Sequence, residues 1–159
     1  MFLVGDKIVY PMHGAGVIEA IERRNILGKS REYYVLRMPI GEMRVLVPVG
    51  AVPEAGLRPI VSKEVVAEVF SLLSEEPSEE QENWNRRYRT NMEKMKSGDI
   101  FDLAEVVRNM TRRDQLRGLS TTEKKLLDNA RQLLVSELVL VEDLDPESVI
   151  HKVSDCLSA

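Results

Sequence analysis

The sequence predicts an α+β protein, with a small, strongly bent β-barrel of the Tudor or SH3 type followed by an all-α part of about five helices. In residues 1–60, apolar residues form short stretches that alternate or are β-branched, separated by glycine and proline turns. This pattern is typical of strands. After Pro59 the apolar residues recur with a helical period of about 3.6. We therefore expect one domain at residues 1–62 and a helical domain at residues 63–159.

Four or five short strands are expected in the first part. Each stretch is rich in β-branched or aromatic residues and ends at a turn signal such as Pro11, Gly28, Gly41 or Pro48. Because so few short strands cannot form a wide sheet with two buried faces, closure into a small barrel is the economical arrangement. The stretches are Lys7–Tyr10, Val17–Arg24, Glu32–Met38 and Met43–Val47, with a hairpin turn in Asn25–Ser30.

Start signals delimit the five expected helices. Ser62 can cap the first helix, Ser78–Gln81 and Ser120–Glu123 have the pattern of capping boxes, and Asp145-Pro146 reads as an N-cap followed by proline. The expected helices follow Ser62, run from Ser78 to Lys96, from Ile100 toward Gly118, from Ser120 through Val141, and from Asp145 through Leu157.

Composition excludes several classes of protein. Hydrophobic residues are 43% and charged residues 30% of the chain, which is enough apolar material for a packed core. No apolar run approaches the roughly 18–20 residues of a membrane span, and the first residues lack the pattern of a signal peptide, so we expect a cytoplasmic protein without a membrane contact. The single Cys156 excludes an intramolecular disulfide.

Signals for an enzyme are weak. Two histidines and one cysteine are scattered along the chain, which argues against a zinc site. Gly14-Ala15-Gly16 lacks the third glycine of a dinucleotide loop, and Gly28-Lys29-Ser30 lacks the earlier glycine of a phosphate loop. We expect no cofactor, no metal and no catalytic residue.

Basic residues concentrate in one segment. The net charge of the chain is −4, yet residues 83–118 carry nine basic and five acidic side chains, while residues 61–82 carry one and seven. A locally basic stretch inside an acidic protein indicates a confined anion-binding surface.

The segment Asn83–Arg89 holds the only tryptophan, Trp84, and the three arginines 86, 87 and 89. Arginine contacts phosphates, and a planar aromatic side chain can stack on a base or wedge into a base step. Trp84 also falls at helical spacing with Tyr88 and Met92, and a lone tryptophan is more often part of a core. Its place near the start of a helix, between polar neighbours, favours exposure, so both interpretations stay open.

Further basic residues follow the tryptophan segment. They provide either additional DNA contacts or an exposed helical face paired with nearby carboxylates such as Glu105, Asp114 and Glu123. They are Arg108, Arg112, Arg113, Arg117, Lys124 and Lys125.

Motifs along nearly the whole chain resemble the CarD/CdnL family of bacterial transcription regulators. The Trp-x-Arg-Arg-Tyr motif at Trp84–Tyr88 is specific, whereas the N-terminal part alone is shared with the polymerase-binding module of transcription-repair coupling factors. The matching segments are Val4–Pro11, His13–Val17, Asn83–Arg89, Ser97-Gly98, Ala104–Arg108, Arg112–Asp114, Gly118–Ser120, Glu123–Leu127 and Ala130-Arg131.

The resemblance implies a Tudor-like domain that docks on the β subunit of RNA polymerase and a helical domain that touches promoter DNA at the upstream edge of the melted bubble. The tryptophan that wedges into the minor groove matches Trp84. The DNA-binding set is then Trp84, Arg86, Arg87, Arg89, Arg113 and Lys124.

The polymerase-facing basic residue at the end of the second strand matches Arg24. A second basic position of the family falls on Leu46, and Arg44, two residues earlier on the same strand face, is an alternative source of charge. The expected polymerase-binding set is Arg24, Arg44, Leu46, Val47 and Pro48.

The favoured function is therefore a non-enzymatic, monomeric transcription regulator that stabilises the open promoter complex and binds free DNA weakly. Three alternatives compete with it. A DNA-free adaptor would bury Trp84 as a structural residue. A small enzyme would need a pocket with paired titratable groups, and a conventional sequence-specific factor would need polar base-reading side chains on a recognition helix.

Overall fold

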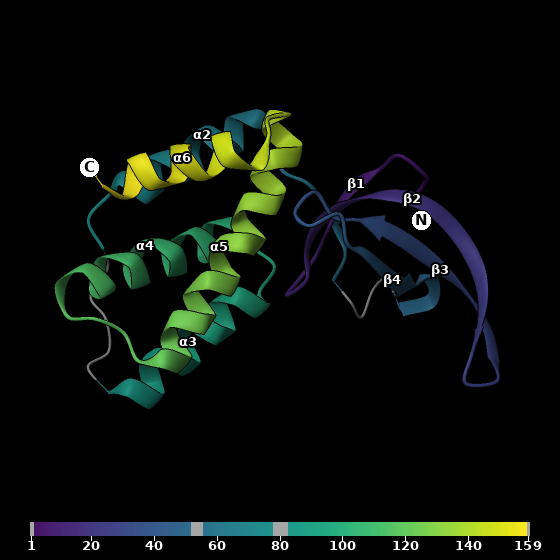
Figure 1. Ribbon diagram of the computed structural model, residues 1–159, viewed down its shortest axis with the longest axis horizontal. Helices are drawn as coiled ribbons and strands as arrows, with labels where there is room; N and C mark the ends of the chain where they lie inside the picture. The colour runs from purple at the N-terminus through teal and green to yellow at the C-terminus, as the bar shows by residue number, and fades with distance from the viewer. Residues whose placement is uncertain (1, 52–55, 78–82, 159) are drawn as a thin grey trace.

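The computed structural model describes residues 2–51, 56–77 and 83–158. An antiparallel sheet formed by the first part of the chain lies beside a group of helices formed by the rest (Figure 1). The predicted α+β class, with its strands first and its helices second, is confirmed.

The sheet has five strands in the order β4-β3-β2-β1-β5. Among the described strands, β4 and β5 form the two edges and do not pair with each other, so the sheet is open where closure into a barrel was expected. β5 has only two residues, and one of them, Pro59, has no N–H to donate to a neighbouring strand. The strands are β1 (Lys7–Tyr10), β2 (Gly14–Ile26), β3 (Lys29–Arg37), β4 (Arg44–Pro48) and β5 (Arg58–Pro59), and a 3₁₀ turn, Val49–Ala51, follows β4.

The predicted hairpin joins β2 to β3. Ile26 pairs with Lys29, and the two turn residues, Leu27 and Gly28, both have positive φ, 53° and 79°. Two central residues of this kind make a turn whose twist matches that of the flanking strands. The hairpin projects away from the helices (Figure 1).

The predicted N-caps of three helices are confirmed. The side chain of Ser62 accepts from the Val65 amide, that of Ser120 from the Glu123 amide, and that of Asp145 from the Ser148 amide. The capping box expected at 78–81 lies outside the described residues, and the helix expected to run from Ser78 begins instead at Trp84, with Asn83 as its N-cap. The helices are α2 (Lys63–Ser74), α3 (Trp84–Lys96), α4 (Ile100–Leu116), α5 (Thr121–Glu142) and α6 (Pro146–Leu157).

Each half of the molecule has its own buried apolar cluster. The cluster of the sheet comprises Ile8, Ile18, Tyr34, Leu36, Met38 and Val47. The larger cluster joins all five helices, and α5 contributes the most residues to it, among them Leu126, Ala130, Leu134 and Leu138. Within the described residues, no helix is both long and apolar enough to cross a membrane.

Candidate nucleic-acid interface

Trp84 is the first residue of α3, and Asn83 caps that helix by accepting a hydrogen bond from the Arg86 amide. Trp84 as a whole residue is 40% exposed. One face of its indole stacks on Tyr88, one helical turn later, with the ring centroids 5.3 Å apart and the planes at 12°. Trp84 is therefore neither fully buried nor free to rotate, because part of the ring faces solvent while Tyr88 supports the rest.

The indole nitrogen is also held. Nε1 of Trp84 donates to Oγ of Ser120, the N-cap of α5, at 3.2 Å. The same hydroxyl donates to Oε1 of Glu123 at 3.1 Å and accepts from the Glu123 amide at 3.2 Å. One hydroxyl group can serve one acceptor and two donors, so Ser120 links the tryptophan directly to the first turn of α5.

Behind the indole lies a buried ion pair between α3 and α5. Nε of Arg87 donates to Oε2 of Glu123 at 2.8 Å, and Nη2 of Arg87 donates to Oε1 at 3.2 Å. Arg87 is 6% exposed and Glu123 2%. Because a buried charge is tolerated only when it is paired and hydrogen-bonded, this pair fixes the orientation of the first turn of α3 against α5.

The pKa of the Glu123 carboxyl reflects this environment. Burial by itself raises its pKa, but the hydrogen bond and charge of Arg87, together with the hydrogen bonds from Ser120, outweigh burial and bring it below the ordinary value of 4.5. Glu123 therefore stays ionised while the pair is intact.

The predicted DNA contacts separate into two groups. Arg86, Arg89 and Lys124 are exposed, and none of them forms an ion pair with another residue of the described chain. Arg113 is half-buried on α4. Arg87, by contrast, faces Glu123 in the interior, so its guanidinium is not presented to solvent as a phosphate contact would require.

The sequence predicted Ser120 and Glu123 as a capping box, and Glu123 also as a candidate partner of nearby basic residues on an exposed helical face. Their contacts with Trp84 and Arg87 span 36 residues of sequence. The signal available in the sequence was a cap serine followed by a glutamate in the first helical turn. This signal does not reveal that α3 contacts both residues.

The predicted polymerase-facing residues lie on the sheet. β4 is an edge strand, paired only with β3 among the described strands. Val47 is fully buried in the sheet core, whereas Leu46 and Pro48 are half-buried. Alternation along the strand puts Arg44, Leu46 and Pro48 on the face opposite Val47.

The two basic residues of this set are exposed and each is paired with a neighbouring carboxylate. Arg24 contacts Glu22 at 2.7 Å and Arg44 contacts Glu19 at 2.6 Å. The hydrogen bond from Arg44 lowers the pKa of Glu19.

The structure does not bring Arg24 and Arg44 together. Their partners on β3 are Arg31 and Arg37, six residues apart, which corresponds to about 20 Å along a strand. Arg24 and Arg44 therefore lie at separate places on the sheet, while Arg44 remains on the same strand face as Leu46.

Within the described residues, no cluster of three histidine, cysteine or acidic side chains could hold a metal ion.

Two family models match the chain. The model described as "CarD-like/TRCF RID domain" matches residues 2–61, and the one described as "CarD, C-terminal domain" matches residues 68–154. The chain is also 38% identical over 149 residues to a protein of Bacillus subtilis (strain 168) named "Putative transcription factor YdeB". That alignment covers 94% of this chain and 97% of the relative.

Proposed function

Because this chain belongs to the CarD/CdnL family of transcription regulators, we propose that it docks on RNA polymerase through its sheet and stabilises the open promoter complex through Trp84. The observation that supports this proposal most directly is the state of the indole. It is partly exposed at the start of α3, yet it is held by Tyr88 and Ser120.

A held aromatic side chain is suited to act as a wedge. Its orientation is set before DNA arrives, so little side-chain entropy is lost on contact. A contact that forms only at an opened minor groove shifts the population toward open DNA. One stacked aromatic side chain contributes about 1–3 kcal/mol, which corresponds to roughly a 5- to 150-fold change in the ratio of open to closed complexes.

Exposed cations on α3 and in the first turn of α5 would contact the phosphates. We assign this role to Arg86, Arg89 and Lys124, which are exposed, with Arg113 on α4 as a further candidate. Such contacts position a protein on the duplex without reading its sequence. Arg87 acts in this proposal as a positioning residue, because its pairing with Glu123 orients the helix that carries Trp84.

On the polymerase side, we assign docking to the edge strand β4 and to Arg24. An unpaired edge can add a strand from a partner through backbone hydrogen bonds, and the open edge at β4 allows this. The partner is the β subunit of RNA polymerase. Arg24 would supply charge complementarity near the hairpin, while Leu46 offers an apolar contact on β4.

The two functions divide near residue 62, with docking assigned to residues 1–62 and DNA contact to residues 63–159. The separate apolar clusters of the two halves support this division.

The decisive variant is Trp84→Ala. Because the ring is partly exposed, its removal should cost clearly less than the roughly 3–5 kcal/mol of a buried tryptophan. Polymerase binding in co-purification should persist, while the lifetime of the open complex should fall to that measured without the protein. Leu116→Ala, an 81% exposed apolar residue on α4, is the matched control and should change neither quantity.

The competing function is a DNA-free adaptor, favoured by the hydrogen bond to Ser120 and the stacking on Tyr88, which tie the indole to the protein. It predicts the opposite result for Trp84→Ala: a strongly destabilised protein whose folded fraction still prolongs the open complex normally.

A further inference from the structure

Arg58 and Glu137 form an ion pair that joins the sheet to the helices. Nη1 and Nη2 of Arg58 donate to the two carboxylate oxygens of Glu137, both at 2.8 Å. Glu137 is 2% exposed. Arg58 lies on β5, Glu137 lies on α5, and 79 residues of sequence separate them. The two-pronged geometry fixes direction as well as distance.

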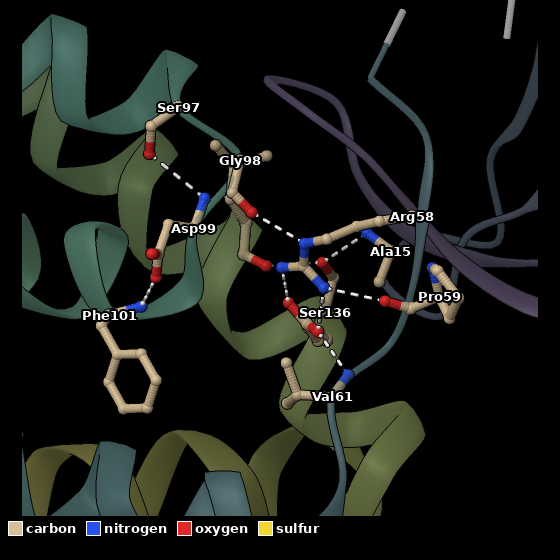
Figure 2. Close-up of polar contacts among 11 residues, drawn as sticks. Ala15, Arg58, Pro59, Val61, Ser97, Gly98, Asp99, Phe101 and Ser136 are labelled. Carbon is tan, nitrogen blue, oxygen red and sulfur yellow. Dashed lines mark hydrogen bonds and ion pairs between the residues drawn. The ribbon is translucent and has the colours of Figure 1, made fainter. Parts of the chain in front are cut away.

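Further hydrogen bonds surround this pair (Figure 2). Nε of Arg58 donates to the carbonyl oxygen of Gly98, between α3 and α4, at 2.7 Å. Oε2 of Glu137 also accepts from the amide of Val61, in the segment that leads from the sheet into α2, at 2.9 Å. Four segments therefore meet at Arg58 and Glu137: β5, the connection that follows it, the turn between α3 and α4, and α5.

A second contact lies one residue earlier on α5. The amide of Ala15, on β2, donates to Oγ of Ser136 at 2.9 Å. The neighbouring Gly14 has φ of 111°, and a Cβ atom there would lie 3.0 Å from Oγ of Ser136. The strand thus approaches α5 at a distance that requires glycine.

Apolar residues of the first half, among them Met12 and Ile40, also pack against the helical cluster, but the contacts at Arg58, Glu137 and Ser136 are polar and directional. Apolar packing resists separation but is non-directional. The hydrogen bonds at Arg58, Glu137 and Ser136 are therefore the contacts best suited to fix the angle between the two halves.

The same helix carries the contacts that hold Trp84. Glu123 and Ser120 lie at the start of α5, and Glu137 lies 14 residues after Glu123, a separation of about 21 Å along a helix. In Figure 1, α5 extends from beside α3 to the sheet. One rigid helix therefore connects the tryptophan site to the sheet.

We propose that Glu137 is a positioning residue: by holding Arg58 and the Val61 amide against α5, it fixes the sheet relative to Trp84, so that docking of the sheet determines where the indole meets DNA. This inference rests on the proposed function for its consequence at the promoter, but the fixed angle itself is a property of the free protein.

The angle is tested in the free, full-length protein. Spin labels are attached to Lys29→Cys in the hairpin and Lys125→Cys on α5, both exposed positions, after Cys156→Ser. Pulsed electron paramagnetic resonance then gives the distribution of distances between the two spin labels. We expect one narrow distribution for the otherwise unaltered protein and a broad one for Glu137→Gln.

A second variant guards against a simple loss of folding. Arg58→Met combined with Glu137→Met keeps the side-chain volumes and removes both charges, a replacement that is often neutral for stability. It too should give a broad distribution. Asp128→Asn removes an exposed carboxylate from the same helix and should leave the distribution narrow. A narrow distribution in the folded double-methionine variant would overturn the proposal.

The consequence is tested with polymerase and promoter DNA. The double-methionine variant should bind polymerase with unchanged affinity, yet its extension of the open-complex lifetime should fall at least about fivefold, because a contact is lost when geometry no longer permits both engagements. Asp128→Asn should retain the full extension. If the double-methionine variant gave a broad distance distribution and still prolonged the open complex as much as the unaltered protein, the positioning role would be refuted. If Trp84→Ala has no effect on the lifetime, the proposed function fails, while the distance measurement still decides whether Glu137 fixes the angle.

Discussion

The indole Nε1 of Trp84 donates a hydrogen bond to the hydroxyl of Ser120, which joins the first residue of α3 to the residue that caps α5. The same hydroxyl contacts Glu123, and Glu123 pairs with the buried Arg87. The exposed ring is thus supported by a buried polar network, and changes to that network should be transmitted to the ring.

Ser120→Ala should loosen Trp84 without removing it. Loss of the N-cap costs about 1 kcal/mol, and the indole loses its hydrogen bond. We expect a changed tryptophan emission spectrum and a shorter open-complex lifetime. Ser120→Thr keeps a hydroxyl and should preserve most of both. An alanine variant with unaltered emission and lifetime would show that Ser120 does not hold the ring.

Arg86 and Arg87 are neighbours with opposite environments, so their alanine variants should differ sharply. Arg87→Ala leaves Glu123 buried without its partner, which should lower the free energy of unfolding by about 3–5 kcal/mol. Arg86→Ala changes an exposed residue and should alter it by no more than about 0.5 kcal/mol. Urea unfolding measures both. Similar stabilities of the two variants would contradict the role assigned to the buried pair.

The Arg87–Glu123 pair should make stability depend on pH in the acid range. The folded-state pKa of Glu123 lies below its ordinary value of 4.5. The contribution of ionised Glu123 to the free energy of unfolding is therefore fully present above pH 4.5 and is lost as the pH falls through the folded-state pKa. Between neutral pH and acid, the unaltered protein should lose more stability than Glu123→Gln. Asp128→Asn controls for the removal of one carboxylate, and its free energy of unfolding should depend on pH as that of the unaltered protein does. If the stability of Glu123→Gln depended on pH in that same way, the lowered pKa of Glu123 would be contradicted.

Arg24→Glu should weaken polymerase binding, because the substitution replaces a cation that meets an acidic surface with a carboxylate that is repelled by it. Binding to free DNA should not change. Arg23→Glu is a matched control, since adjacent residues of a strand point to opposite faces and Arg23 pairs with Glu32 instead. Pull-down with purified polymerase measures both variants, and equal losses would argue against a specific contact at Arg24.

A fragment of residues 1–62 should fold as a β-domain and retain polymerase binding, because its apolar cluster lies within the sheet. It should be less stable than the same domain in the full chain, since it lacks α5 and the partner of Arg58. Circular dichroism and a pull-down test both points. An unfolded fragment would show that the sheet depends on α5.

Local signals in the sequence were sufficient for much of the fold. Ser62, Ser120 and Asp145-Pro146 mark helix starts that the structure confirms, because an N-cap acts within three residues of itself. The hairpin at Leu27-Gly28 was predictable for the same reason, since a two-residue turn depends on its own backbone angles. The open sheet was not, because closure depends on which strands meet at the edges.

The sequence by itself determined that residues 83–89 combine one tryptophan with three arginines near the start of a helix, whereas the structure showed that Trp84 is its first residue. Only the tertiary structure decided that Arg86 faces solvent while Arg87 faces Glu123, and that Arg58 meets Glu137. The physical reason is distance along the chain. Hydrogen bonds within a turn are encoded by neighbours, whereas a pairing across 36 or 79 residues depends on how whole helices and strands pack, and no local pattern records that.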